Sequence, residues 1–457
     1  MGETQSEKDQ VPDNIKEIVI AETSNRLDTE FLNHLSRGTT GYRSLHNLTH
    51  EVGNQYRGRF LFELLQNAHD ALPAHPKNGN PARVAMILED EEAFGVLYVA
   101  NDGAPFSKSN FLSLSQLAQS DKDPEKNIGN KGIGFRSVLE ISAKPQIFSR
   151  SSSASRVFDG YCFGFDPKFI TDLLEPILLL AQGEDNVSSP IDTARFIVGW
   201  DHGHLKEFRA KMVDRERFLD DLRKQSRTTL ESLPVEGLRR LWLQHELKYL
   251  SPYLFPFPLN IKEASARLLD LQESGFTSVI RLPLKNPEAR QAVIEKMGEF
   301  SASTVMFLER LTELSLRNGS EAHRTIGRRE RARDGQSLDT TFISIYDSLE
   351  DKKRRYVLWQ ECIQLRDDPL ITEAIVNELP EQWHSLQEIT ISIASPTCVI
   401  PEQGFYSVYL PTLQPTGCGA YINAPFYAKL DRTGVDFNNS YMLSATTSWT
   451  EISANTS

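Results

Sequence analysis

The chain has 457 residues, of which 39% are hydrophobic, so it is long enough for roughly two or three domains with ordinary cores. Its 62 acidic residues outnumber 50 basic ones, and this charge balance argues against a general binder of nucleic acid or anionic membranes. No apolar run approaches the roughly 18 residues of a membrane-spanning helix, and the polar N-terminus does not resemble a secretory signal. The four cysteines show neither metal-ligand spacing nor a disulfide framework, so we expect an intracellular protein, cytoplasmic or nuclear, with no membrane attachment.

The N-terminal part contains two predicted helices. Residues 1–13 have the composition of a disordered tail, and apolar residues at helical spacing predict a helix within 14–36. A second helix is predicted over 57–72, where leucines and an alanine form one stripe. The other stripe consists of Glu63, Gln66, Asn67 and Asp70. A polar stripe usually faces water, but this one has short amide and carboxylate groups and no lysine.

Strands and loops are predicted after this helix. The segments 84–88 and 96–100 read as strands, and the second runs into the turn sequence Asn101-Asp102-Gly103. The remaining elements predicted before residue 286 are a short helical piece and charged mobile loop over 107–127, a hairpin over 145–166, a charged helical insertion over about 204–250, and a strand within 275–284.

A glycine-rich segment precedes another predicted helix, which begins at about Phe135. Gly129, Gly132 and Gly134 allow close backbone approach, and the N–H groups and dipole at a helix start favour a polyphosphate. The glycine order differs from that of dinucleotide-binding and P-loop motifs. This pattern alone is equally compatible with a tight turn that binds nothing.

The helix over 57–72 carries the residues expected for metal and water chemistry. Magnesium keeps several waters and takes one or two protein ligands besides phosphate oxygens, a role that the Asn67 amide oxygen fits. Glu63 lies one turn earlier on the same face and could deprotonate a water against a γ-phosphate. The alternative for Glu63 is an ordinary surface glutamate.

These motifs together resemble those of GHKL ATPases, the superfamily of certain heat-shock chaperones, gyrase, MutL and histidine kinases. The strings Glu-Leu-Leu-Gln-Asn-Ala, Asn-Asp-Gly-Ala-Pro-Phe and Lys-Gly-Ile-Gly-Phe-Arg-Ser-Val are most similar to the sacsin and plant NO VEIN-like branch. The resemblance implies an α+β fold: a GHKL (Bergerat-type) two-layer α/β sandwich over 37–285, after an N-terminal tail and helix over 1–36.

The resemblance also implies roles for individual positions. Glu63 matches the general base, and Asn67 matches the magnesium ligand. Asn101 stands where most members place an aspartate that accepts from the adenine amino group, and an amide accepts without charge assistance. Arg432 is the candidate for a cation from the second domain that reaches the γ-phosphate, with Lys429 as runner-up, although both are equally compatible with ordinary surface cations. The other implied nucleotide-binding positions are Asp70, Gly103, Gly129, Lys131, Gly132, Gly134, Phe135 and Thr277.

After about residue 286 the pattern of elements restarts. A helix over 288–299 and several strands predict a second α/β, transducer-like domain over 286–440. The tail over 441–457 has no evident closing element, which is consistent with the front part of a longer protein or a truncated gene product. The basic runs 324–333 and 352–355 are predicted to be solvated turns, because acidic residues interleave the first.

The implied function is ATP binding with slow Mg²⁺-dependent hydrolysis, coupled to conformational change and a chaperone-like or remodelling output on a protein client. A nucleotide-gated scaffold with little or no hydrolysis is the alternative. A nucleic-acid-associated factor that uses the arginine run has the least support. The sequence identifies neither the client nor the oligomeric state.

Overall fold

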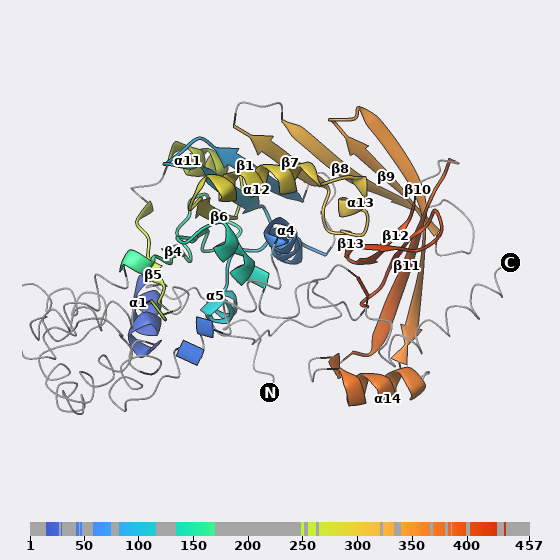
Figure 1. Cartoon of the computed structure of the whole chain (residues 1–457), viewed down its shortest axis with the longest axis horizontal. Coiled ribbons are helices and arrows are strands. Elements are labelled where there is room, and N and C mark those ends of the chain that lie inside the picture. Colours follow the sequence, from blue (N-terminus) through green and yellow to red (C-terminus); the bar gives the residue numbers. More distant parts are fainter. Residues whose placement is uncertain are drawn as a thin grey trace, which may run out of the picture.

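The fold is a mixed α/β structure built on one large, mostly antiparallel sheet with several helices (Figure 1). A computed structural model describes residues 15–26, 29, 43–44, 46–47, 58–74, 82–115, 134–169, 248–250, 255–261, 265–319, 323–332, 340–365, 369–379, 383–384, 386–398, 403–426 and 434–435. The predicted tails and nearly all of the predicted insertion over 204–250 lie outside these residues.

In the described part of the chain, fourteen strands form the sheet in the order β13-β12-β14-β11-β10-β9-β8-β7-β1-β2-β6-β3-β4-β5. Only β1 with β7 and β12 with β14 pair in parallel among these neighbours. The strands are β1 Arg83–Glu89, β2 Val96–Asn101, β3 Gln146–Ser149, β4 Phe163–Gly164, β5 Phe257–Pro258, β6 Ser278–Pro283, β7 Glu313–Asn318, β8 Arg324–Ala332, β9 Thr340–Asp347, β10 Lys352–Gln364, β11 Glu388–Pro396, β12 Phe405–Val408, β13 Leu410–Pro415 and β14 Tyr421–Asn423.

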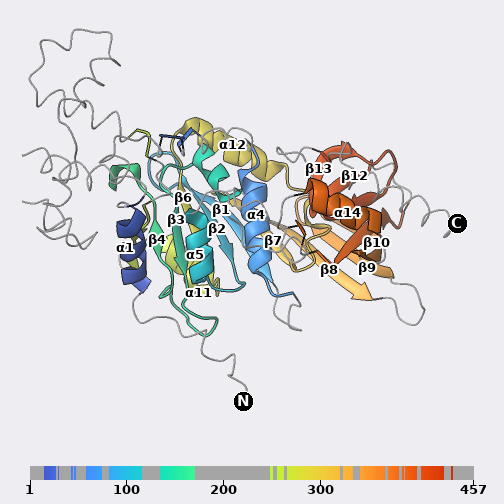
Figure 2. The same ribbon diagram turned by 90° about the horizontal axis from the view of Figure 1, so that it is seen from below.

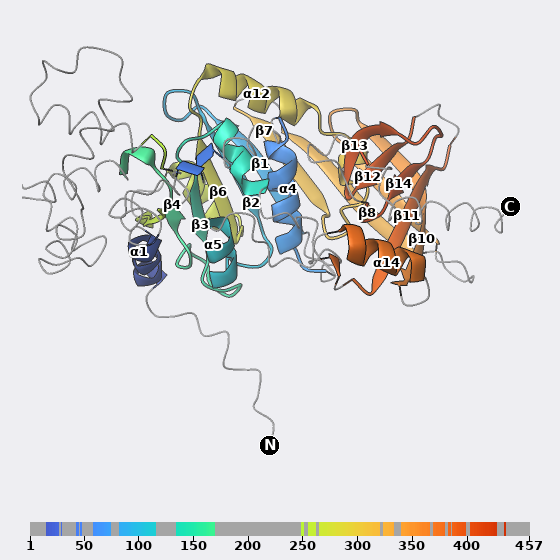
Figure 3. The same cartoon turned by 60° about the horizontal axis from the view of Figure 1, so that its bottom comes forward.

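Helices pack on both faces of the sheet. Figures 2 and 3 show α4 lying in front of β1 and β2, with α5 beside it toward β3, and Figure 1 shows the sheet curving around α4 and α13. The described helices are α1 Ile15–Arg26, α4 Phe60–Ala71, α5 Lys108–Ser115, the 3-10 helix η2 Gly134–Glu140, α11 Ala266–Glu273, α12 Pro287–Gly298, α13 Ala302–Val305 and α14 Pro369–Glu378.

The alternation of side chains along the strands divides the core. Met86 of β1 belongs to the same buried cluster as Leu64 of α4, whereas the next residue back, Ala85, belongs to a second cluster with Leu268 of α11. Successive strand residues point to opposite faces, so β1 and β2 are buried on both sides. A third cluster joins α14 to β11.

Local sequence explains where several helices begin. The Asn286 side chain accepts a hydrogen bond from the Ala289 N–H at 2.8 Å, and Pro287 follows as the first residue of α12. The Ser265 side chain accepts from the Leu268 N–H in the same way at the start of α11. Both are favourable N-caps because they satisfy amide groups that lack an intrahelical partner.

Most predicted elements that fall on described residues are confirmed with nearly the same bounds. The helices predicted within 57–72 and 288–299 are α4 and α12, and the strands predicted over 84–88 and 96–100 are β1 and β2. The predictions did not include α11, α14, β7 or β8.

The prediction that both basic runs are solvated turns was wrong. Residues 324–332 form β8, and 352–355 open β10. Both pair antiparallel with β9, which supplies the backbone partners that a turn would find in water. Arg328 is only 3% exposed, and its Nε donates to the carbonyl oxygen of Met306 at 2.9 Å.

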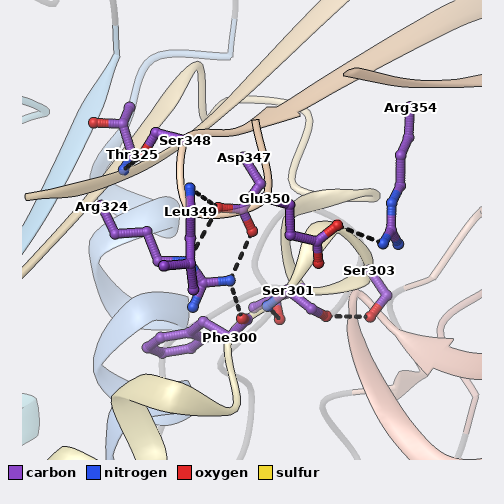
Figure 4. A network of polar contacts seen from close by, with 11 residues as sticks. Phe300, Ser301, Ser303, Arg324, Thr325, Asp347, Ser348, Leu349, Glu350 and Arg354 are labelled. Atoms are coloured by element: carbon purple, nitrogen blue, oxygen red, sulfur yellow. Dashed lines mark hydrogen bonds and ion pairs between the residues drawn. The ribbon is translucent and has the colours of Figure 1, made fainter. Parts of the chain in front are cut away.

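A buried ion pair holds β8 and β9 to the segment between α12 and α13 (Figure 4). The Arg324 guanidinium contacts the Asp347 carboxylate at 2.7 Å and donates to the Phe300 carbonyl oxygen at 2.7 Å. Burial alone would raise the pKa of Asp347, but hydrogen bonds from Arg324 and from the Leu349 N–H outweigh it and hold that pKa below its usual range.

Candidate functional site

The helix α4 presents the acid and the amide that the sequence singled out. Glu63 is 4% exposed, and Asn67, one turn later on the same face, is half-buried. The alternative of an ordinary surface glutamate therefore fails. Burying a carboxylate costs free energy unless polar groups compensate, so a buried acid on this face is a chemically distinctive feature.

The turn that follows β2 is closed by Thr277. Its hydroxyl lies 3.1 Å from the Asn101 carbonyl oxygen and 2.7 Å from that of Gly103, and its N–H donates to the Asn101 carbonyl oxygen at 2.9 Å. The Asn101 side-chain oxygen accepts from the Gly103 N–H at 3.1 Å. Thr277 therefore meets Asn101 and Gly103, two predicted nucleotide-binding residues from a distant part of the sequence.

The same turn rests on the C-terminal end of α4. The Ala104 N–H donates to the Ala71 carbonyl oxygen at 2.7 Å. A Cβ added at Gly103 would lie 2.2 Å from that oxygen and 2.8 Å from the Leu72 nitrogen, which is closer than real Cβ contacts. Glycine is therefore required here by close backbone approach, whether or not the site binds a ligand.

Asp102, between Asn101 and Gly103, forms an ion pair with Arg83. One of its carboxylate oxygens accepts from the Arg83 N–H at 2.7 Å, and the other accepts from the Arg83 Nε at 2.9 Å. This charge-assisted pair fixes the turn to the start of β1. Both Asp102 oxygens therefore have a structural partner, whereas the adenine position of the resemblance falls on Asn101.

The loop before β7 closes the end of α4. The Arg310 N–H donates to His69 Nε2 at 3.3 Å, and its guanidinium donates to the Asp70 carbonyl oxygen at 3.1 Å. Burial lowers the pKa of His69, and the opposing effect of the neighbouring Asp70 carboxylate offsets only part of this shift. A neutral His69 is also the form that can accept from Arg310, because both nitrogens of the charged ring are donors. The Asp70 side chain is 5% exposed and lies 3.9 Å from His69 Nδ1.

The end of the glycine-rich segment packs beside α4. Gly134 begins the 3-10 helix η2, Phe135 is buried, and η2 contacts α4. The predicted helix start is thus present as a 3-10 helix. The positions Gly129, Lys131, Gly132, Lys429 and Arg432 lie outside the described residues.

Two buried serines at this site were missed from the sequence. Ser149 of β3 and Ser278 of β6 have their hydroxyl oxygens 3.1 Å apart, and Ser149 Oγ accepts from the Phe106 N–H at 2.8 Å. They connect the segment that leads into α5 to the ends of β3 and β6 beside Thr277. Ser278 follows Thr277 directly, but nothing local to either serine indicates that it pairs across 129 positions.

The described residues contain neither a cluster of metal-ligating side chains nor a helix suited to span a membrane. Within them, no group of three or more His, Cys, Asp and Glu side chains could hold a metal ion. None of the helices in the described ranges combines the length and hydrophobicity that a bilayer crossing requires.

Part of the chain is similar to a known plant protein. No protein-family model matches the chain. Over 125 residues the chain is 34% identical to Protein NO VEIN of Arabidopsis thaliana, an alignment that covers 27% of this chain and 4% of that protein. The chain therefore matches a small fraction of the length of this relative, and the similarity indicates a loose relationship.

Proposed function

We propose that this chain binds Mg-ATP in a GHKL-type site beside α4 and hydrolyses it slowly. The observation that carries the proposal is the buried Glu63 with Asn67 one turn later, on a helix whose end supports the 101–103 turn. The partial similarity to NO VEIN agrees with the branch that the three motifs resemble.

In the proposed reaction, Glu63 orients a water and takes its proton as the oxygen attacks the γ-phosphorus. The bond from that phosphorus to the bridging oxygen breaks, and ADP leaves with the electron pair. The Asn67 amide oxygen would hold magnesium, which would neutralise charge on the phosphate oxygens. The turn with Asn101 and Gly103 lines the base side of the site, and Thr277 positions this turn through its carbonyl groups.

The proposed output is a conformational change passed to the strands beyond β7. The strand β7 pairs in parallel with β1, and Arg310 just before it contacts the end of α4. A shift of α4 on nucleotide binding would therefore reach β7 through the hydrogen bonds of Arg310 to the His69 side chain and to the Asp70 carbonyl oxygen. A chaperone-like or remodelling action on a protein client is the output that the family resemblance favours.

One observation favours the alternative of a nucleotide-gated scaffold. The Asn101 side-chain oxygen is uncharged and already accepts from the Gly103 N–H. Its attraction for an adenine amino group is therefore weaker than that of a free carboxylate. A scaffold of this kind would bind ATP reversibly and release it largely unhydrolysed.

The test measures ATP affinity and turnover for the wild type, Glu63→Gln and Asn67→Ala, with Glu295→Gln, an exposed glutamate on α12, as the matched control. We expect Glu63→Gln to keep binding and lose turnover by about 10²–10⁴-fold. Asn67→Ala should lose the magnesium-dependent part of binding. Binding without turnover in the wild type would select the scaffold, and wild-type behaviour of both site variants in both assays would refute the site.

A further inference from the structure

The sheet has an exposed face along β8, β9 and β10. Every second residue of these strands points into the main core, and those residues are Ile326, Ile343, Ile345, Tyr356 and Leu358. The residues between them point to the opposite face, the one that α11 covers at β1 and β2. Three large aromatic residues on that face remain exposed: Phe342 at 37%, Tyr346 at 42% and Trp359 at 42%.

The three rings are arranged as a platform. Phe342 lies directly across from Val357, so Trp359, two residues further along β10, is its diagonal neighbour. Tyr346 lies four residues from Phe342 on the same strand, about 14 Å away at the usual rise per strand residue. Each ring is more than a third exposed, so each leaves a surface for a flat ligand group.

Four cations alternate with these rings. In the strand register, Arg329 and Arg355 flank Ser344, Arg331 lies across from Phe342, and Lys353 lies across from Tyr346. We call these four residues and the three rings the aromatic–basic face. Acids beside it include Asp351, which accepts from the Tyr346 hydroxyl at 3.3 Å, the exposed Glu361, two residues beyond Trp359, and Glu313 of β7, which lies across Gly327 from Tyr346 in the strand register.

The arginines of this face differ from those on the opposite face of the same strands. On the opposite face, Arg324, Arg328 and Arg354 each form an ion pair, with Asp347, Glu330 and Glu350 respectively. None of the four cations of the aromatic–basic face forms an ion pair with a residue that the structure describes. In a chain with a net charge of −12, this is a local concentration of uncompensated positive charge.

We infer that the aromatic–basic face binds single-stranded nucleic acid. Exposed bases stack on aromatic side chains, and the phosphates between them contact arginine and lysine. A duplex keeps its bases stacked inside and cannot use the rings. An acidic peptide can use the cations but has no flat groups that require an open platform. The site is separate from α4 and does not depend on the proposed ATP chemistry.

The experiment uses the full chain and a fluorescein-labelled oligouridine of about 20 nucleotides, longer than the roughly 4–16 nucleotides that one binding fold covers. Fluorescence anisotropy gives the affinity as salt is raised. If four phosphates are contacted, log affinity falls with log salt at a slope of about −2.8, which is roughly 50-fold between about 50 and 200 mM. Arg329→Glu should reduce the slope by about 0.7, whereas Arg156→Glu, an exposed arginine in the 151–157 turn, should leave it unchanged.

Stacking is tested separately from charge. Trp359→Ala should weaken binding by about 5- to 150-fold, the range that loss of one stacked base implies. Trp359→Leu, which keeps an apolar side chain on the strand, should lose a similar factor, and circular dichroism establishes that both variants are folded. Leu413→Ala, at a 75% exposed residue of β13, is the matched control.

The outcomes separate the possible ligands. Tight binding of oligouridine that weakens in Arg329→Glu and in both Trp359 variants supports the inference. Absence of wild-type binding at low salt overturns it. The inference is also overturned by a second combination of results: a duplex or polyglutamate displaces the labelled oligouridine as effectively as unlabelled oligouridine does, and the Trp359 variants bind with wild-type affinity. The face would then recognise only negative charge.

Discussion

Replacing Gly103 by alanine tests whether the turn after β2 rests on the end of α4. The new Cβ would lie 2.2 Å from the Ala71 carbonyl oxygen, 2.5 Å from its carbonyl carbon and 2.8 Å from the Leu72 nitrogen. All three are backbone atoms, so no side-chain rotation relieves the overlap. The turn must therefore move away from the helix.

The expected cost follows from the contacts that this movement breaks. The hydrogen bonds from the Ala104 N–H to Ala71 and from the Thr277 hydroxyl to Gly103, each 2.7 Å long, are lost or lengthened. Each contributes about 0.5–1.5 kcal/mol net, and the steric displacement adds about 1–3 kcal/mol. We expect the free energy of unfolding to fall by about 2–6 kcal/mol and ATP affinity to fall with it.

Urea unfolding followed by fluorescence gives the change, and Gly298→Ala is the matched control. At Gly298, in the last turn of α12, an added Cβ meets no atom within 4 Å. Alanine there should be neutral or stabilising by up to about 1 kcal/mol. Equal unfolding midpoints for the two variants, together with equal ATP affinities, would refute the close approach between Gly103 and the end of α4.

Two further predictions concern charge. Because burial lowers the pKa of His69 below its ordinary value of 6.5, the unfolded chain binds this proton more readily than the folded chain. The stability from neutral His69 is therefore full above about pH 6.5 and falls below it, by up to about 1.4 kcal/mol per pH unit. When urea unfolding is measured from pH 5 to 8, the free energy of unfolding should change less steeply with pH for His69→Gln than for the wild type. An identical pH dependence of the two proteins would contradict this role of His69. Asp347→Asn should lower the free energy of unfolding by about 2–3 kcal/mol, since it leaves the largely buried Arg324 guanidinium without its counter-charge. Glu350→Gln, which removes the more exposed pair with Arg354, should change it by less than about 0.5 kcal/mol, and equal effects of the two substitutions would show that burial does not matter here.

The elements that could be predicted from the amino-acid sequence are those whose residue pattern lies within one helix, strand or helix start. The two stripes of α4 follow from residues three and four positions apart, and this spacing alone put Glu63 and Asn67 on one face. The apolar runs of β1 and β2, and the Asn286-Pro287 start of α12, are local in the same sense. The resemblance to GHKL motifs, which is also carried by short strings, pointed to Asn101, Gly103 and Thr277 together.

Contacts between side chains far apart in the sequence could be known only from the folded structure. Thr277 reaches a turn 176 positions earlier, Asp102 is occupied by Arg83, and the basic run at 324–332 is a strand with alternating buried and exposed arginines. Which strands pair, and which carboxylate contacts which cation, depends on groups that are far apart in the sequence and that the fold brings close together. A local pattern gives the spacing of side chains along one element, but it does not specify what lies opposite them.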